Sequence, residues 1–121
     1  MTADSSSLSS AAGKVVPPGA AQHKTAGPYS PVLEVQANRL VVISGQVAVD
    51  PDGNILGDTI EEQTRATLEN CRRQLETADC TFHDVFKVNA YMADINEWNR
   101  FNAASLCIRH IDLIETSCWF N

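Results

Sequence analysis

The sequence predicts an α+β fold in which two helices pack on one face of a sheet, and three observations lead to this prediction. Valine and isoleucine are concentrated in residues 32–36 and 40–49, which favours strands. Apolar and polar residues alternate over 84–92, as in a strand with one buried face. Helical spacing over 59–78 and again after residue 94 completes the order β-β-α-β-α, which is typical of a sheet covered by helices on one side.

The first 26 residues form a segment of low complexity. Serine, alanine, glycine and proline fill 15 of the 26 positions, without an aromatic residue or an isoleucine. Such a segment buries too little apolar surface to offset the entropy lost on ordering. We therefore expect residues 1–26 to be a disordered leader. A mitochondrial or plastid transit peptide is the alternative, which the absence of arginine and the presence of Asp4 disfavour.

The first two strands, 32–36 and 40–49, are expected to form a hairpin. They flank Ala37-Asn38, where asparagine tolerates the left-handed conformation of a tight turn. Gly45 inside the second strand marks a bulge or a close approach of the backbone. The run Asp-Pro-Asp-Gly-Asn at 50–54 then predicts a turn.

The first helix is expected from about residue 59 to 78. Thr59 and Glu62 have the spacing of a capping box, in which a hydroxyl and a carboxylate each satisfy a backbone donor. Six residues at helical spacing predict the face that packs on the sheet. They are Ile60, Thr64, Leu68, Cys71, Leu75 and Ala78.

The third strand, 84–92, has two different faces. We expect the apolar face to pack on the helix and the other to meet solvent or a partner. The first face carries Phe86, Val88, Ala90 and Met92, and the second carries Val85, Lys87, Asn89 and Tyr91. Asp94 or Asn96 is expected to cap the second helix, whose apolar residues are Trp98, Phe101 and Leu106.

Charge and composition exclude several classes of protein. The formal net charge of −6 argues against a protein that binds nucleic-acid phosphates, and no apolar run approaches the roughly 20 residues that span a bilayer. The four cysteines are too widely spaced for a CxxC motif, and no secretory signal precedes them. We interpret them as free thiols in a reducing compartment, which predicts a cytoplasmic protein; a disulfide framework is the alternative.

Few residues point to chemistry by themselves. The sequence has no GxSxG elbow, P-loop, GxGxxG or HExxH motif. Cys107, His110 and Cys118 are too few and too loosely paired for a zinc site, so no metal is expected. Two segments remain. Prolines and a glycine at 27–31 hold Tyr29 in a rigid loop, and Ser44-Gly45 combines a hydroxyl with a backbone that a ligand can approach.

These segments and others resemble, in the same order along the chain, the RidA/YjgF family of imine and enamine deaminases, some of which are named endoribonuclease L-PSP. The resemblance covers residues 27–103, about two-thirds of the chain. Its motifs are Gly27-Pro28-Tyr29-Ser30, Ser44-Gly45-Gln46, Asp50-Pro51 with Gly53, Ile60-Glu61-Glu62-Gln63-Thr64-Arg65, Leu68-Glu69-Asn70, Asp84-Val85 with Lys87, Asp94-Ile95-Asn96 and Phe101-Asn102.

The resemblance implies a chorismate-mutase-like fold that assembles as a homotrimer, with ligand sites in clefts between subunits. It implies hydrolysis of reactive 2-imino acids and their enamines to 2-keto acids and ammonia, without a metal or an organic cofactor. Tyr29, Ser44 and Gly45 would line the cleft, and Asn102 matches a family position nearby. The ribonuclease activity ascribed to some members is disfavoured by the negative charge, so no nucleic-acid partner is expected.

After Ala103 the resemblance ends, and residues 104–121 form a divergent tail. The two C-terminal strands of the family, the arginine that holds the substrate carboxylate and the glutamate that serves the water have no counterpart there. Arg109 and Glu115 stand in unlike contexts. The catalytic residues are therefore not assigned. The sequence leaves open a deaminase and, as the alternative, a binding or regulatory module for small ligands on the same scaffold.

Overall fold

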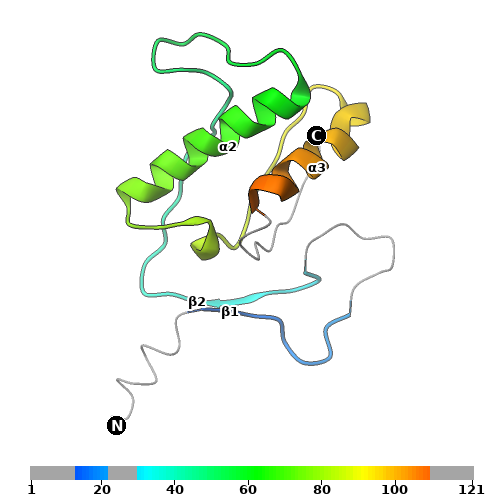
Figure 1. The fold of residues 1–121 in the computed structure, drawn as a ribbon. Helices are drawn as coiled ribbons and strands as arrows, with labels where there is room; N and C mark the ends of the chain where they lie inside the picture. The colour runs from blue at the N-terminus through cyan, green and yellow to red at the C-terminus, as the bar shows by residue number, and fades with distance from the viewer. Residues whose placement is uncertain (1–12, 22–29, 110–121) are drawn as a thin grey trace.

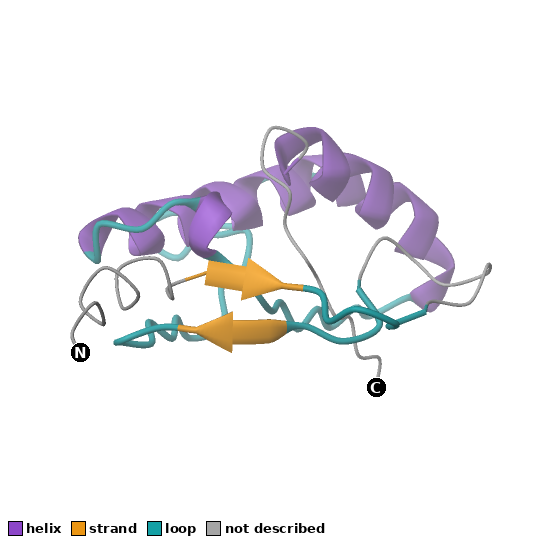
Figure 2. Ribbon diagram, turned by 90° about the horizontal axis from the view of Figure 1, so that it is seen from below, coloured by secondary structure: helices purple, strands orange, loops and turns teal. Residues whose placement is uncertain are grey.

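The computed structural model describes residues 13–21 and 30–109 of the 121-residue chain. Its elements are the strands β1 (Gly13–Val15) and β2 (Glu34–Gln36), the helices α2 (Ile60–Thr77) and α3 (Trp98–Arg109), and two one-turn 3₁₀ helices, Phe82–Asp84 and Ile95–Glu97. The two α-helices pack against each other (Figure 1). Figure 2 shows the helices in one layer, with the strands and extended segments in the other. The expected α+β architecture is confirmed.

Helix α2 lies where its sequence pattern predicts. Thr59 caps it, because its hydroxyl accepts a hydrogen bond from the Glu62 amide at 3.2 Å. The second half of the predicted capping box differs, since the Glu62 carboxylate accepts from the amide of Asp58, at 2.7 Å, rather than from Thr59. The helix stops at Ala78, and Asp79 follows with a φ of 56°.

The predicted stripe is the buried side of α2. Thr64 and Leu75 are buried, with 7% and 6% of their surface exposed, and the other four residues of the stripe are half-buried. Ala48 and Phe82 join Leu75 as the buried apolar residues of the described ranges. The core is therefore small and sits between α2 and the segments that precede and follow it.

The one-turn 3₁₀ helix Ile95–Glu97 leads into α3, and Asp94 caps that turn, because its carboxylate accepts a hydrogen bond from the Asn96 amide at 2.9 Å. Of the two predicted caps, Asp94 is thus the one that forms, one turn before α3 itself begins. The rings of Trp98 and Phe101 stack with centroids 5.2 Å apart. Arg100 reaches the first turn of α2 and donates two hydrogen bonds, of 2.7 and 2.6 Å, to the two carboxylate oxygens of Glu61. The side chain of Leu106 lies outside the described part.

The predicted hairpin is wrong in its pairing. Strand β2 is the first of the two expected strands, but its antiparallel partner is β1, with Lys14 opposite Val35. β1 comes from the segment expected to be a disordered leader, where Val15 supplies the β-branched side chain that strands favour. The remaining residues of that leader, 1–12 and 22–26, and the tail from residue 110 onward lie outside the described residues.

The predicted strands 40–49 and 84–92 are not formed as strands: Asp84 ends the 3₁₀ helix Phe82–Asp84, and the residues from 85 to 92, like those from 40 to 47, have no regular secondary structure. An isolated bridge joins Val49 to Ile55 across the predicted turn, where the Asp50 carboxylate accepts from the amide of Asn54 at 2.9 Å. A strand is defined by a ladder of backbone hydrogen bonds to a neighbouring strand. Residues 38–46 and 86–92 make no backbone hydrogen bond to another described residue, so neither segment counts as a strand. The predicted alternation survives from Lys87 onward, since Val88, Ala90 and Met92 are half-buried while their neighbours are exposed. Phe86 is the exception, because it is exposed.

Candidate functional site

Three of the four predicted ligand-binding residues lie in the described part of the chain. Ser44 and Gly45 are exposed in the extended segment that follows β2, and Asn102 is half-buried on α3. The Asn102 carbonyl accepts a hydrogen bond from the Ser105 hydroxyl at 3.1 Å. Tyr29 lies outside the described residues.

An open cleft of about 350 Å³ runs between the extended segment and the C-terminal end of α2. Ser44 lines one wall, whereas Gly45 and Asn102 are not part of the lining. The lining residues are Val41, Val42, Ile43, Ser44 and Gln46 from the segment, and Gln74, Thr77 and Ala78 from α2 and its C-cap. The structure thus joins the predicted serine to residues that sequence reasoning did not select.

The cleft lining is uncharged and rich in hydrogen-bonding groups. Gln46 donates its side-chain amide to the Ser44 carbonyl at 3.2 Å, and the Thr77 hydroxyl donates to the Gln74 carbonyl at 2.7 Å. The Ser44 hydroxyl can both donate and accept. These walls suit a small polar molecule that is held by hydrogen bonds rather than by a buried ion pair in the lining itself.

Beside Gly45 the space is open. Among residues 13–21 and 30–109, no heavy atom lies within 4 Å of the position that a Cβ would occupy there. The close approach of another backbone segment, which the glycine predicted as one alternative, is therefore not made by the described chain. The same opening leaves the backbone next to Ser44 accessible from outside.

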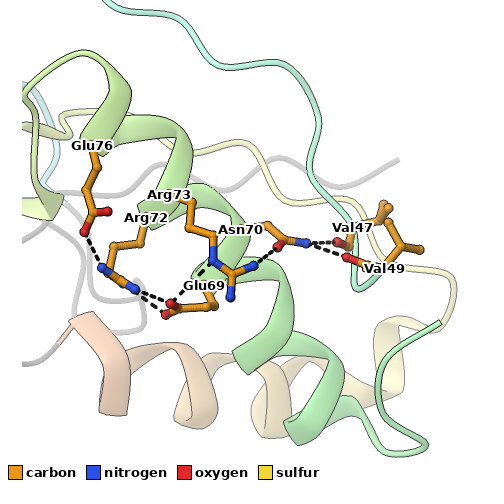
Figure 3. A network of polar contacts seen from close by, with 7 residues as sticks. All are labelled: Val47, Val49, Glu69, Asn70, Arg72, Arg73 and Glu76. Carbon is orange, nitrogen blue, oxygen red and sulfur yellow. Dashed lines mark hydrogen bonds and ion pairs between the residues drawn. The ribbon is translucent and has the colours of Figure 1, made fainter. Parts of the chain in front are cut away.

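Asn70 holds the extended segment in place beyond the cleft. Its side-chain amide donates to the carbonyls of Val47, at 2.9 Å, and Val49, at 3.0 Å (Figure 3). Ser44 is only three residues upstream of Val47, so this contact fixes the distance between the segment and α2. Asn70 belongs to the motif Leu68-Glu69-Asn70 of the family resemblance, but its position in the sequence gives no sign that its side chain holds the extended segment.

A network of charges surrounds Asn70 on the outer face of α2. Arg72 pairs with Glu69 and Glu76, and Arg73 donates to the Asn70 side-chain carbonyl at 3.3 Å. The hydrogen bond from Arg72 lowers the pKa of Glu69 and raises that of the arginine. All these charged groups are solvent-exposed, and none lines the cleft.

The thiols and acidic groups of the described part give no second reactive centre. Cys71 and Cys80 are free, and burial raises the pKa of the Cys71 thiol, which disfavours the nucleophilic thiolate. No cluster of three or more histidine, cysteine, aspartate or glutamate side chains in the described ranges could hold a metal ion. None of the described helices is long and apolar enough to cross a membrane.

A hydrogen bond joins Arg39 to the wall of the cleft, a contact that sequence reasoning missed. Its guanidinium donates to the Ala78 carbonyl at 2.9 Å, and Ala78 is a lining residue. One signal was present in the sequence. Helix α2 has no basic residue in its last turn, although its terminal carbonyls favour a positive charge.

Comparison with known protein families gives one match that covers most of the chain. Residues 19–110 match the family described as endoribonuclease L-PSP. This range contains both helices, β2 and the whole cleft lining. The match therefore concerns the part of the chain in which the site lies.

Two curated relatives illustrate the range of this similarity. A RutC family protein of Pyrococcus horikoshii is 39% identical over 80 residues, which are 65% of this chain and 62% of the relative. The 2-iminobutanoate/2-iminopropanoate deaminase of Homo sapiens is 36% identical over 77 residues, which are 63% of this chain and 55% of the enzyme. The chain thus spans about 60% of the length of the curated relatives it matches.

Solved structures agree with the architecture. The crystal structure of yeast Mmf1 superposes with a TM-score of 0.64 at 26% identity, covering 80% of this chain and 76% of that one. The crystal structure of Escherichia coli TdcF with bound serine gives a TM-score of 0.57 at 26% identity, with 64% of each chain covered. A small amino acid is the ligand named for the second structure.

Proposed function

Since the chain belongs to the endoribonuclease L-PSP family, to which the RidA-type 2-imino acid deaminases also belong, we propose that it hydrolyses small 2-imino acids to 2-keto acids and ammonia. The observation that carries this proposal is the family match over residues 19–110, together with 36% identity to a named deaminase. Metal and organic cofactors are not part of the proposal.

The reaction asks little of the protein. Water adds to the imine carbon, the carbon–nitrogen bond breaks, and the nitrogen leaves as ammonia while the oxygen remains as the keto group. A protein accelerates this by holding the carboxylate-bearing substrate and one water in register and by moving protons between them. The hydroxyl of Ser44 and the open backbone beside Gly45 support binding of such a substrate.

No general acid or base follows from the lining of the cleft. Its eight residues include no titratable side chain, so the protons of the reaction would move through water or through groups beyond the lining. We propose Tyr29, Ser44, Gly45 and Asn102 as the substrate-binding set by family resemblance. Their assembly in one site is proposed to depend on a homotrimer, in which neighbouring subunits complete each cleft.

The test is ammonia release from an imine that an amino-acid oxidase generates in situ. We expect the full chain to accelerate release over buffer and the Ser44→Ala variant to lose most of that acceleration. The control is Asn99→Ala, which truncates an exposed polar side chain of α3 outside the cleft and outside the face expected to meet a partner. Release at the buffer rate by a protein shown to be folded would refute the proposed activity.

One observation favours a second candidate, a binding module without catalysis. The absence of any titratable group from the cleft lining suits binding better than proton transfer. In this case a 2-keto acid binds in the cleft, yet ammonia release stays at the buffer rate. The ribonuclease activity in the family name is not proposed, because a net charge of −6 disfavours binding to a phosphate backbone.

The cellular location is proposed to be the cytoplasm, on the evidence of the free thiols Cys71 and Cys80. Mitochondria are the alternative. A relative of this chain from Schizosaccharomyces pombe, 37% identical over 87 residues, is named as mitochondrial.

A further inference from the structure

Arg39 is placed at the edge of the Ser44 cleft by two connections. It lies two residues before Val41, the first lining residue of the extended segment, and its guanidinium donates to the carbonyl of Ala78 on the opposite wall. In Figure 1 the segment after β2 rises past the C-terminal end of α2, so both connections meet at the same place. The guanidinium thus places a positive charge at the edge of a cleft whose lining residues are uncharged.

The hydrogen bond to Ala78 explains the position of Arg39 and leaves most of its N–H donors available. The C-terminal end of a helix carries partial negative charge, and α2 has no basic residue of its own in that turn. A guanidinium has five N–H donors in a planar fork, and the described residues accept from one nitrogen, at 2.9 Å. Asp79, next to Ala78, forms no ion pair with Arg39 among the described residues.

We propose that Arg39 holds the carboxylate of a small acid in the Ser44 cleft. The free edge of the guanidinium donates hydrogen bonds to the two carboxylate oxygens, a geometry that arginine forms better than any other side chain. The Ser44 hydroxyl and the amide of Gln74 then face the polar group on the neighbouring carbon. A volume of about 350 Å³ lies at the lower end of the roughly 300–1,000 Å³ typical of ligand sites, which favours a short acid.

The identity of this acid as a 2-imino or 2-keto acid rests on the proposed function, whereas the carboxylate site itself does not. In the family pattern, the arginine that holds the substrate carboxylate lies in the region that corresponds to the divergent tail. Arg39 gives this chain a carboxylate partner outside that tail. The competing explanation is that Arg39 only caps α2. A capping role predicts lower stability in its variants but unchanged affinity for an acid.

The experiment is a titration of the full chain with 2-oxobutanoate, a stable acid of the product class, followed by ¹⁵N–¹H correlation spectra and by calorimetry. We expect the shifts to centre on the amides of Ser44, Gln46, Gln74 and Thr77. Arg39→Gln should weaken binding by about tenfold or more, the loss expected for a hydrogen-bonded charge pair. Arg39→Lys keeps the charge without the fork, and should weaken binding by a smaller factor at unchanged helix content.

The matched control is Arg65→Gln, which removes one positive charge from an exposed position of α2 outside the lining. Because salt screens the effect of a distant surface charge, Arg65→Gln should change the affinity for 2-oxobutanoate by less than about twofold. A neutral amide of the same size, 2-oxobutanamide, should bind wild type and Arg39→Gln equally. Unchanged affinity of 2-oxobutanoate in both Arg39 variants, or no binding to wild type, overturns the inference.

Ammonia release separates this inference from the proposed function. Arg39-dependent binding without ammonia release supports the carboxylate site and refutes catalysis. Ammonia release that is equal in wild type and Arg39→Gln, with equal affinities, refutes the site and leaves the deaminase proposal standing. If Arg39→Gln does not fold, Arg39→Lys and the amide comparison decide the matter.

Discussion

At the scale of single residues, Asn70 is the side chain whose contacts reach furthest beyond its own helix. One amide nitrogen donates to two carbonyls of the extended segment, at 2.9 and 3.0 Å. The Val47 carbonyl also accepts from the Val49 amide, at 2.9 Å, whereas no backbone amide of the described residues donates to the Val49 carbonyl. The Asn70 side chain thus supplies hydrogen-bond donors to this segment that a neighbouring strand would supply in a regular sheet.

The first prediction is that Asn70→Asp destabilises the protein by about 1–3 kcal/mol, because it removes both donors and sets a carboxylate against two carbonyl oxygens. Urea unfolding at pH 7 measures the change. Asn99→Asp is the matched control, since it makes the same substitution at an exposed residue away from the predicted partner face and should change stability by less than about 0.5 kcal/mol. Equal losses in the two variants would mean that the Asn70 contacts do not stabilise the segment.

At the scale of elements, α2 buries its stripe unevenly. Leu75 is 6% exposed, whereas Leu68 is half-buried. We predict that Leu75→Ala costs about 2–5 kcal/mol, the range for a buried leucine, and that Leu68→Ala costs clearly less. Thermal or urea unfolding of both variants tests this order. A larger loss for Leu68→Ala would place the centre of the core one or two turns nearer the N-terminus of α2.

The link between the helices predicts a pH dependence. The hydrogen bond from Arg100, which is the largest cause, lowers the pKa of Glu61 below its ordinary value. A carboxyl with a depressed folded-state pKa stabilises the protein above its unfolded pKa and loses that contribution as pH falls through the folded one. Glu61→Gln should therefore be less stable than wild type at pH 7, and the difference should shrink in the acid range below about pH 4.5.

Urea titrations at pH 7 and pH 3.5 measure this difference. Glu34→Gln, on β2, is the control, because Glu34 forms no ion pair within the described ranges. A Glu61→Gln effect of the same size at both pH values would show that the carboxylate charge does not contribute. Because the pair is exposed, the expected effect is small.

The helices were predictable from the sequence because their signals are local. Thr59 caps α2, and Asp94 caps the 3₁₀ turn that precedes α3; each is set by residues within one turn. The stripe from Ile60 to Ala78 likewise specifies the buried face of α2 from the spacing of its own residues. The strands were not predictable in the same way, because the pairing of a strand depends on a second segment that cannot be identified from the strand's own residues. The pattern at 40–49 is that of a strand, yet β2 pairs with Gly13–Val15, which the composition of the leader concealed.

The site was predictable only in part for the same reason. Ser44 was selected from a local motif, and it lies in the cleft. Gln74, Thr77 and Arg39 meet it through the packing of α2 on the extended segment, which no local spacing encodes. The assignment of Tyr29, Ser44, Gly45 and Asn102 to substrate binding stays a prediction.

At the scale of the whole molecule, the described residues leave many large apolar side chains exposed. Val42 is 88% exposed and Tyr91 is 68% exposed, and both belong to extended segments without strand partners in the described ranges. Such surfaces mark interaction sites. The face of Val85, Lys87, Asn89 and Tyr91 was expected from the sequence to meet a partner, and three of these four residues are exposed.

We therefore predict a homotrimer in solution, measured by light scattering with size-exclusion chromatography at micromolar concentration. Tyr91→Glu should lower the mass toward that of the monomer, because it places a charge in the contact. Ile55→Glu, which charges an exposed apolar residue on the turn at 50–55, should not. A folded monomer in the wild type would exclude both the trimer and a site completed by neighbouring subunits.

The attachment of β1 sets the order in which this molecule opens. β1 is held to β2 over three residue pairs. Among the residues that the structure describes, Lys14 is the one that joins β1 to the helical layer by side-chain hydrogen bonds, at 2.7 Å to the His83 carbonyl and 3.0 Å to that of Val85. So short a ladder opens at little cost, whereas amides in the middle of α2 exchange only when the helix leaves its packed position. In deuterated solvent, the amide protons of the β1–β2 pairing should therefore exchange first and together. The protected amides in the middle of α2 should exchange later.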